Sequence, residues 1–558
     1  MRSSFYSLTT FFRAGAVLVG LLAAPTLLFA QTPAWQRAVV VSQASGAISA
    51  ALQTTTDASG NVYVTGTFAG SVTFGATTLT ATGIRDIFVA KWSSATNQFV
   101  WAVQQGNGSV TYPVAIFLQG TSLYVGASGT STGVARIYKF TDAGTSASLT
   151  WNQALSYCDL LGMTASGGNV YVSGSFTSAT LTVGSFTLAN NTPNSSDVFV
   201  AKLVDAGTTS SYAWALRAGG STPESGGPMA VQGNSLYLMG TYYGTAAAPS
   251  VFGTTSLVSA GDVDAYVAKL TDAGTTAQFT WVKRMGGTGV EQTGALAVAG
   301  TSVYATGQFN SLNADFGTTT LTPAGGADAF VTKLTDAGAT ADFTWTQRLG
   351  GTDLDYVNGL AVQGTSVYVG GVSTSPNLVL GTTTLTNAGQ EDGFLATLTD
   401  AGLTSGFTSA RAIATSGSDG VSGISVNGPN VYVNGYIGQG TVSLGPVTLA
   451  NPTATSAAYF ASFTSTALAT TPSTLAGSSL YPNPATARTS VRLPALSGAG
   501  TATLSLYDGL GRIAKKLTVA VPAGGLIQEL ELGNLVSGIY LLHVQAGTAS
   551  TRHRLVIE

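Results

Sequence analysis

Apolar residues are grouped along most of the chain into short runs of strand length, separated by glycine, asparagine and aspartate. Residues 358–364 form one run with a turn, residues 365–371 a second, and the segment that begins at Asp392 a third. The third run does not alternate between apolar and polar residues, which is typical of a strand covered on both faces. An Asp-x-Gly turn at 400–402 then leads into a fourth run. The pattern predicts an antiparallel unit of four strands.

This unit recurs about every 64 residues, with one step of 50 between Trp101 and Trp151. Tryptophans mark the repeat at Trp35, Trp101, Trp151, Trp214, Trp281 and Trp345. Tyrosines run in phase at Tyr63, Tyr124, Tyr171, Tyr237, Tyr304, Tyr368 and Tyr432. Aspartates begin the third strand at Asp86, Asp197, Asp264, Asp328 and Asp392, and hold the next turn at Asp142, Asp205, Asp272, Asp336 and Asp400. Strand signals at such a period predict a circular or stacked array of small sheets.

The predicted fold is all-β, a seven-bladed β-propeller of four-stranded blades over residues 31–465. Seven inner hairpins can be counted, but the last repeat ends at 457–465 without a fourth strand, and the chain begins with an unpaired one at 34–40. We expect this N-terminal strand to complete the last blade beside 458–463, which would leave no exposed interior edge. An open β-solenoid is the alternative, but its coils are normally shorter and would not explain the displaced strand.

Residues 35–465 resemble the SBBP-type repeats of bacterial seven-bladed propellers. The resemblance rests on a recurring aspartate, aromatic and Val-x-Lys-Leu segment, then Trp, Gly-Gly and Asn-Val-Tyr-Val-x-Gly. The second repeat departs from it, because Arg136-Ile-Tyr-Lys-Phe lacks the leading aspartate. The resemblance implies a propeller and carries no defined function.

The C-terminal part differs in composition. A small polar linker at 466–478 precedes residues 479–558, whose period-2 strands and Gly turns predict a β-sandwich. Its motif residues are Tyr481, Pro482, Asn483, Pro484, Tyr507, Asp508, Gly511, Arg512, Gly538 and Tyr540. They make this segment similar to the C-terminal sorting domains of the type IX secretion system in Bacteroidetes. The resemblance implies contact with that machinery, export across the outer membrane, removal of the tail, and release or surface attachment. An accessory β-sandwich that binds something is the alternative.

The N-terminus is predicted to be a signal peptide over residues 1–30, with Arg2 and Arg13 before an apolar run and cleavage after Ala30. A membrane anchor is the weaker interpretation, because the run is short and contains Gly20 and Pro25. We therefore expect no transmembrane segment in a mature chain that is secreted or lies on the cell surface. Cys158 is the one cysteine, so no internal disulfide is expected.

Charge and histidine content exclude several functional classes. Only 8% of residues are charged and the net charge is −3, which argues against nucleic-acid binding. Both histidines lie in the tail, so the predicted propeller has no histidine for a Ser-His-Asp triad or a zinc site. We assign no catalytic residue and expect no cofactor. Arg217, Arg284 and Arg348 each follow a tryptophan by three residues and are interpreted as outer-strand packing.

Four acids, Glu224, Glu291, Asp355 and Asp419, occupy one repeat position, predicted four residues before the innermost strand. Around a closed ring they could bind Ca²⁺ or a polyhydroxylated ligand, because clustered oxygens suit both. Alternatively, each acid caps its own loop. The sequence favours a monomeric, non-enzymatic scaffold that binds an extracellular glycan or protein. The alternative function is a carbohydrate-active hydrolase or lyase that uses carboxylates near the channel.

Overall fold

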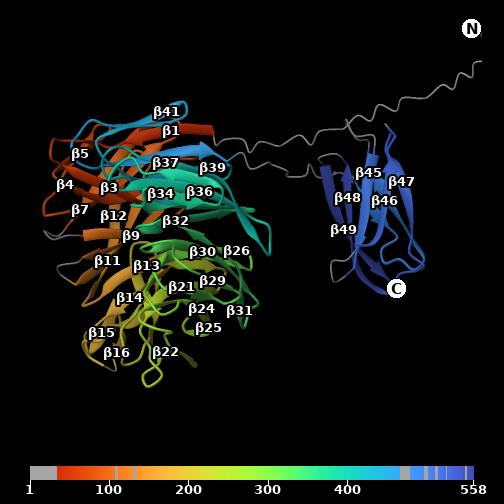
Figure 1. The fold of residues 1–558 in the computed structure, drawn as a ribbon, viewed down its shortest axis with the longest axis horizontal. Coiled ribbons are helices and arrows are strands. Elements are labelled where there is room, and N and C mark those ends of the chain that lie inside the picture. The colour runs from red at the N-terminus through yellow and green to blue at the C-terminus, as the bar shows by residue number, and fades with distance from the viewer. Residues whose placement is uncertain are drawn as a thin grey trace, which may run out of the picture.

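The computed structural model describes residues 34–106, 111–129, 133–190, 192–465, 478–494, 501–508, 513–522, 524–546 and 549–558. The predicted signal peptide and all but Ser478 of the predicted linker lie outside these ranges. In the described part of the chain every helix or strand element is a β-strand (Figure 1). No helix there is long and apolar enough to cross a membrane.

Between residues 34 and 465 the described chain forms seven main antiparallel sheets, numbered here 1 to 7 along the chain, with the innermost strand named first. Sheet 1 consists of β3 (Ile48–Thr56), β4 (Val62–Ala69), β7 (Asp86–Ser93) and β8 (Gln98–Gln105). Sheet 2 consists of β9 (Thr111–Gln119), β10 (Ser122–Gly129), β11 (Val134–Asp142) and β12 (Ala147–Ser156). Sheet 3 consists of β13 (Asp159–Ser166), β14 (Asn169–Phe176), β17 (Asp197–Asp205) and β18 (Ser210–Ala218). Sheet 4 has a split inner strand, β19 (Glu224–Ser225) and β20 (Met229–Gln232), followed by β21 (Ser235–Tyr242), β24 (Asp264–Asp272) and β25 (Ala277–Met285).

The remaining three sheets follow the same order. Sheet 5 consists of β26 (Glu291–Ala299), β27 (Ser302–Phe309), β30 (Asp328–Asp336) and β31 (Ala341–Leu349). Sheet 6 consists of β32 (Asp355–Gln363), β33 (Ser366–Ser373), β36 (Asp392–Asp400) and β37 (Ser405–Ile413). Sheet 7 consists of β38 (Gly420–Asn427), β39 (Asn430–Ile437), β42 (Ala457–Thr464) and, as its outermost strand, β1 (Ala34–Val40).

Six of the sheets carry a small hairpin between their second and third strands. These hairpins are β5 (Ser71–Phe74) with β6 (Thr77–Thr80), β15 (Thr180–Val183) with β16 (Phe186–Ala189), β22 (Ser250–Phe252) with β23 (Thr255–Leu257), β28 (Ala314–Phe316) with β29 (Thr319–Leu321), β34 (Asn377–Leu380) with β35 (Thr383–Thr386), and β40 (Gly440–Leu444) with β41 (Val447–Asn451). A short β2 (Ser42–Gln43) extends the first of them. Among its described residues, sheet 2 has no such hairpin, which accounts for the one short step in the repeat.

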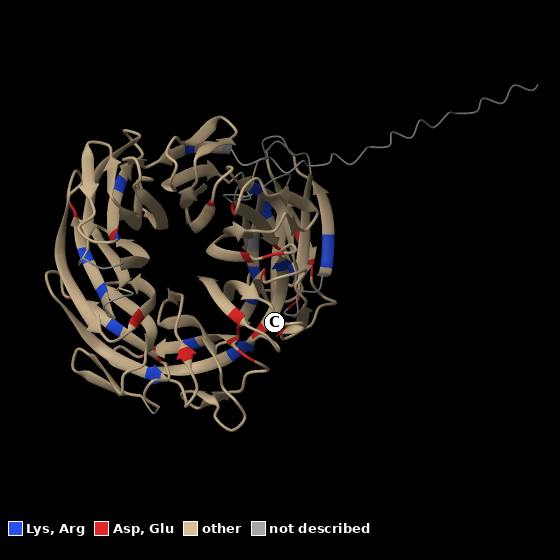
Figure 2. Cartoon of the chain, turned by 60° about the vertical axis from the view of Figure 1, so that its left-hand side comes forward, with Lys and Arg blue, Asp and Glu red and all other residues tan. Residues whose placement is uncertain are grey.

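The sheets stand side by side around a common axis (Figure 2). Apolar side chains between successive sheets are buried, and sheet 7 packs against sheet 1 in the same way. One buried cluster joins Val62, Phe88 and Trp92 of sheet 1 to Ala458 and Phe460 of sheet 7. The result is an all-β, propeller-like arrangement whose hydrophobic core is divided among the interfaces between sheets.

The N-terminal strand lies where the sequence placed it. β1 is antiparallel to β42, from Ala34 opposite Thr464 to Val40 opposite Tyr459, with a bulge between Trp35 and Arg37. Sheet 7 is thus assembled from the two ends of this region of the chain. Ser49 adds a backbone hydrogen bond from its N–H to the carbonyl of Ser456, 3.0 Å away.

The C-terminal region folds around a core of its own. One sheet contains β43 (Ser479–Tyr481), β44 (Arg488–Leu493) and β47 (Leu526–Glu531), and the other contains β46 (Ile513–Ala520), β45 (Thr501–Tyr507), β48 (Gly538–Ala546) and β49 (Ala549–Ile557). Val491 and Leu530 of the first sheet share a buried cluster with Leu504, Leu542 and Leu555 of the second. Two sheets facing one core make a small β-sandwich.

Candidate functional site

The four predicted ligand acids lie at the start of innermost strands. Glu224, Glu291 and Asp355 are the first residues of β19, β26 and β32, and Asp419 directly precedes β38. The prediction that they lie four residues before the strand is therefore wrong, because the strands begin earlier than the apolar pattern indicated. All four side chains are buried, with at most 1% of each residue exposed.

Each of these carboxylates accepts a hydrogen bond from the backbone N–H four residues before it. The donors are Gly220 for Glu224 (3.0 Å), Gly287 for Glu291 (3.0 Å), Gly351 for Asp355 (2.7 Å) and Thr415 for Asp419 (2.6 Å). Neighbouring hydroxyls add further bonds, such as that from Ser375 to Asp355 at 2.8 Å. The geometry matches the alternative interpretation, in which each acid caps its own loop. Among the described residues no group of three or more His, Cys, Asp or Glu is arranged to hold a metal ion. Ca²⁺ binding stays a prediction without geometric support.

Burial dominates the electrostatics of these acids. Desolvation raises the pKa of Glu291 to about 7, and the nearby Asp264 carboxylate adds to the shift. Burial also raises the pKa of Glu224, Asp355 and Asp419, against the hydrogen bonds that lower it. A Cβ placed on Gly286 would lie 2.4 Å from Glu291 Oε2 and 2.5 Å from Asp264 Oδ1, and its φ is +146°. Only glycine fits between the two carboxylates.

The arginines that follow the tryptophans form ion pairs and do not merely pack on the outer strand. Arg284 Nη1 lies 3.2 Å from Asp264 Oδ2, and Arg348 Nη1 lies 2.5 Å from Asp328 Oδ2. Arg217 pairs with Asp197 in the same way. Each pair joins the fourth strand to the third within one sheet.

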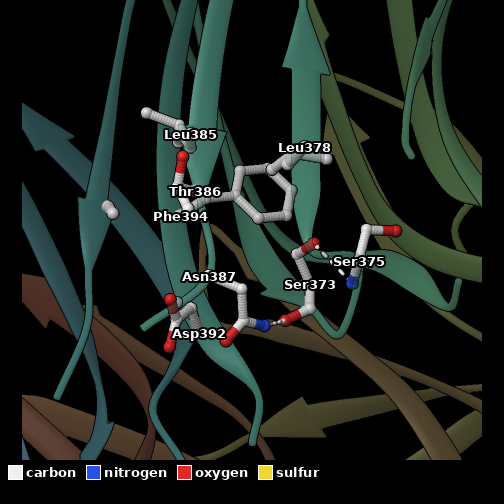
Figure 3. Close-up of a pocket in the computed structure, with 10 residues that line it drawn as sticks. Ser373, Ser375, Leu378, Leu385, Thr386, Asn387, Asp392 and Phe394 are labelled. Atoms are coloured by element: carbon white, nitrogen blue, oxygen red, sulfur yellow. Dashed lines mark hydrogen bonds between the residues drawn. The ribbon is translucent and has the colours of Figure 1, made fainter. Parts of the chain in front are cut away.

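In sheet 6 the arginine position is occupied by Ala412, which lies opposite Phe394 as Arg348 lies opposite Phe330. The space that this leaves is a pocket near Ser373, Asn387 and Asp392 (Figure 3). Its volume is about 10 Å³, room for a single water molecule and not for an organic ligand.

A second set of acids contacts the preceding sheet, a role that sequence reasoning missed. Asp272, at the end of β24 in sheet 4, accepts hydrogen bonds from three side chains of sheet 3: Tyr171 Oη at 2.8 Å, Lys202 Nζ at 2.7 Å and Trp214 Nε1 at 3.0 Å. Its fourth donor is the N–H of Gly274 in its own turn, at 2.9 Å. We call this Tyr-Lys-Trp-Asp group a clasp.

Five interfaces between consecutive sheets contain a clasp. The others join Tyr63, Lys91 and Trp101 to Asp142; Tyr124, Lys139 and Trp151 to Asp205; Tyr237, Lys269 and Trp281 to Asp336; and Tyr304, Lys333 and Trp345 to Asp400. Burial alone would raise the pKa of each aspartate, but these hydrogen bonds outweigh it and lower the pKa. Five of the seven regular tyrosines, five of the six regular tryptophans and all five turn aspartates of the sequence are parts of this one kind of contact.

The two interfaces that flank sheet 7 have no clasp among the described residues. Ser465 takes the aspartate position in sheet 7, since its N–H bonds the carbonyl of Pro429 as the Asp400 N–H bonds that of Thr365. At the interface between sheets 7 and 1, the tryptophan and lysine positions of the clasp are also changed. Arg37 stands at the tryptophan position and Ser462 at the lysine position, because these two residues are paired as Trp101 and Lys91 are in sheet 1. The Arg37 guanidinium lies 4.9 Å from the centre of the Trp92 ring.

The assignment of Trp35 to the tryptophan series is therefore wrong. Trp35 lies opposite Phe463, one pair beyond Arg37, because the bulge at Gln36 separates them in the register. It corresponds to Phe99 of sheet 1, which lies opposite Trp92. Its ring is buried, with 3% exposed, and its Nε1 has no hydrogen-bond partner.

A larger pocket lies beside this unclasped sheet. Its volume is about 440 Å³, and it is lined by Ile48, Gln390, Ser416, Gly417, Ser418, Gly438, Gln439, Ala454, Thr455 and Ser456. The lining comes from loops of sheets 6 and 7 and from the first residue of β3 in sheet 1. It contains none of the four predicted acids.

In the tail, the Tyr-Pro-Asn-Pro segment holds the final strand. Asn483 Oδ1 accepts the Val556 N–H at 2.9 Å, and its Nδ2 donates to the Arg554 carbonyl at 2.5 Å. The peptide bonds before Pro482 and Pro484 are cis. Tyr540, in β48 behind Gly538, is buried and donates to the Val536 carbonyl at 2.9 Å.

Of the other predicted motif residues, Tyr507 ends β45 opposite Leu541, and Asp508 follows it. Gly511 and Arg512 lie outside the described residues. The described motif residues thus belong to one all-β module. Residues 479–558 match the family described as the secretion system C-terminal sorting domain. This tail indicates export to the cell surface or secretion by the type IX system, and it implies an interaction with the machinery of that system.

Other comparisons cover more of the chain at low similarity. No curated protein matches it. A solved protein from Lactobacillus plantarum is 11% identical with a TM-score of 0.38, over 88% of this chain and 100% of that one. The extracellular region of plexin A4 is 7% identical with a TM-score of 0.39, over 92% and 62%. Drosophila semaphorin 1b is 8% identical with a TM-score of 0.34, over 77% and 88%. These scores are too low to inform function.

Proposed function

We propose that residues 31–465 form a seven-bladed β-propeller closed by β1, and that it is an exported scaffold that binds a macromolecule. The sorting-domain match at 479–558 carries the export part of this proposal. The seven sheets and the pairing of β1 with β42 support the closed ring. The kinship of the repeats with the SBBP type stays a prediction.

One face of the ring is the better candidate for binding. The loops that follow the second and fourth strands of each sheet form this face, here called the upper face. It carries large exposed apolar side chains: Ile48, Ile84, Tyr157, Tyr243, Val258, Leu312 and Leu354. Among the described residues, the opposite face exposes Leu403 in one of its tight hairpins and Leu149 just after another. The excess of exposed apolar side chains on one face favours that face as the contact surface.

A binding role is better supported than an enzymatic one. A glycosidase of the carboxylate type needs two acids that face one substrate pocket. The predicted acids are instead buried and bonded within their loops, and no Asp or Glu lines the larger pocket. The full-length protein should bind extracellular polysaccharide or cell-envelope fractions without cleaving them. Release of reducing sugar from any of them would contradict the scaffold proposal.

The export step can be tested by transfer. Residues 477–558 fused to an unrelated protein with a signal peptide should carry it out of a type IX-competent cell. The matched control is the same fusion with Asn483→Ala, which loses both bonds to the last strand and should remain in the periplasm. A native fusion that stays periplasmic while the full-length protein is exported would show that the tail is not a sufficient signal.

A further inference from the structure

The pocket of about 440 Å³ beside sheet 7 lies where the symmetry of the ring is broken. Ser418 precedes Asp419, as Leu354 precedes Asp355 and Val290 precedes Glu291 in the two earlier sheets. A hydroxyl therefore takes the place of an apolar side chain at this one loop. The pocket opens on the upper face, between the loops of sheets 6 and 7 and the start of β3.

The lining is polar but uncharged. None of its residues is ionisable, and its polar side chains are the hydroxyls of Ser416, Ser418, Thr455 and Ser456 and the amides of Gln390 and Gln439. These groups both donate and accept hydrogen bonds. A charged ligand would find no opposite charge here to compensate its desolvation. Sugar hydroxyls, which also donate and accept, match this lining.

An apolar surface accompanies the polar groups. Ile48, the first residue of β3, is 39% exposed and lies in the lining. A pyranose ring presents C–H groups on its faces and hydroxyls around its edge, so one aliphatic contact with several hydrogen-bonding neighbours suits it. The volume falls within the range of about 300–1,000 Å³ that small-molecule sites occupy.

The walls of the pocket are held by the half-buried Gln43 and by two buried side chains, Asn451 and Asp419. Gln43 Nε2 donates to Thr455 Oγ1 and to the Ser456 carbonyl, both at 3.1 Å. Asn451, 2% exposed, donates to the Gly438 carbonyl at 3.1 Å and the Thr455 carbonyl at 2.8 Å. Asp419 accepts the Gly438 N–H at 2.9 Å. A lining fixed before binding lowers the entropy cost of binding.

We propose that this pocket, the seam pocket, binds a sugar residue of a neutral polysaccharide. The proposal rests on the proposed function, because it names the ligand class of the scaffold. One predicted ligand residue, Asp419, acts here through Gly438 as a positioning residue and does not touch the sugar.

Binding can be measured by titrating full-length protein with neutral hexasaccharides of glucose, mannose and xylose, and with hexagalacturonate as the acidic counterpart. At least one neutral hexasaccharide should bind, and hexagalacturonate should bind more weakly. Two variants alter the pocket: Ala454→Trp fills it, and Ser418→Leu restores the side chain of the neighbouring loop. Each should weaken binding at least tenfold. Val290→Ser, at the equivalent position before Glu291 and outside the pocket, is the matched control and should leave affinity unchanged.

Circular dichroism and the melting temperature identify variants that fail to fold, and Gln439→Ala then provides a milder second test. Neutral-sugar binding that survives in both pocket variants overturns the proposal, as does preference for hexagalacturonate or failure of every neutral hexasaccharide to bind. The outcomes also separate the two proposals. If the protein binds cell-envelope material through its upper face but no neutral hexasaccharide, only the seam pocket assignment fails. If it cleaves a hexasaccharide, the scaffold proposal fails.

Discussion

The interfaces between sheets are of two kinds, and their difference follows the path of the chain. Five interfaces, from sheets 1 and 2 to sheets 5 and 6, contain a buried lysine and aspartate at 2.5–2.7 Å. At the two interfaces beside sheet 7, a serine stands where the aspartate would be. One is Ser465, and the other is Ser94, which follows Lys91 by three residues as Asp142 follows Lys139. The buried lysine–aspartate pair is thus confined to interfaces between sheets that are each built from one continuous stretch of chain. Neutral hydrogen bonds, together with the contact of Arg37 with Trp92, hold the sheet that joins both ends.

Those neutral contacts are numerous. Asn434 Nδ2 donates to the buried Ala51 carbonyl at 2.9 Å, and Thr54 Oγ1 lies 3.0 Å from Ser425 Oγ. A buried ion pair contributes little net stability, because desolvation offsets the attraction, but its loss on one side is costly. We therefore infer that the clasps fix how neighbouring sheets align. Sheet 7 is held by the pairing of β1 with β42, by these hydrogen bonds and by apolar packing.

Of the changes that test this comparison, removal of Ala34–Val40 should lower the stability of the protein most. Sheet 7 would lose its outermost strand, β42 would become an edge, and the burial of Trp35 would be lost. We expect destabilisation above about 5 kcal/mol, more than a typical buried aromatic-to-alanine change. Urea unfolding measures it, and hydrogen exchange should locate the loosened amides in sheet 7. Deletion of Ala549–Ile557 is the control and should loosen only the tail. An unchanged unfolding midpoint would contradict closure by β1.

Asp272→Ala comes next. This substitution would leave the buried Lys202 without a negatively charged partner. Tyr171 and Trp214 would each lose the acceptor of their hydrogen bond. Breaking a buried pair from one side costs about 3–5 kcal/mol. Ser465→Ala, at the same position of an unclasped interface, should change stability by less than about 0.5 kcal/mol. If both variants lose the same stability in denaturant titrations, the clasp aspartate contributes no more to stability than the serine of an interface without a clasp.

The repeat and its strands could be predicted because they are local patterns. The apolar runs, the Asp-x-Gly turns and the unpaired strand at 34–40 led to the observed pairing of β1 with β42. The clasp was missed because its members lie one repeat apart, as Lys202 and Asp272 do. No local pattern shows that such residues meet. Trp35 was misassigned because a bulge shifts the register, which residue counting cannot detect.

The seam pocket could not have been predicted from the sequence. Its residues come from three sheets and are common types, such as serine, glycine and glutamine, that also fill ordinary turns. For the predicted acids, the sequence located an equivalent and structurally special position. It could not decide between a ligand role and a capping role, because that depends on which way Glu291 and its equivalents point.

The acids of the clasps and those at the start of the inner strands should contribute to stability with opposite pH dependences. The pKa of Glu291 is about 7 in the folded protein against an ordinary value of 4.5. Between these values the folded state keeps a proton that the unfolded chain has lost. The contribution of Glu291 to the stability of the folded state is therefore fully present below pH 4.5 and is lost as pH rises through 7. The loss is on the order of 3 kcal/mol.

Urea unfolding between pH 4 and 8 should show a larger loss of stability in the native protein than in Glu291→Gln, in which position 291 cannot titrate and only the other buried acids with a raised pKa still do. The clasp acids have a lowered pKa, so their contribution is present above the ordinary aspartate value of 3.8 and disappears as pH falls through the lower folded value. Identical pH profiles for the native protein and Glu291→Gln would contradict the raised pKa.

We expect the smallest effect when two buried tryptophans are compared, Trp281 in a clasp and Trp35 in sheet 7. Trp281 Nε1 donates to Asp336 Oδ1 at 3.1 Å, whereas Trp35 Nε1 has no partner. Replacement by phenylalanine removes one aromatic ring at both sites, but only Trp281→Phe also removes a hydrogen bond to a charged group, worth about 1.5–3 kcal/mol. Trp281→Phe should therefore cost more than Trp35→Phe by about that amount in denaturant titrations. Both rings are at most 5% exposed, so packing losses should be similar. If Trp35→Phe costs as much as Trp281→Phe, the indole N–H contributes nothing, and the stability of the clasp comes from the other donors to Asp336, which are Lys269, Tyr237 and the Gly338 N–H.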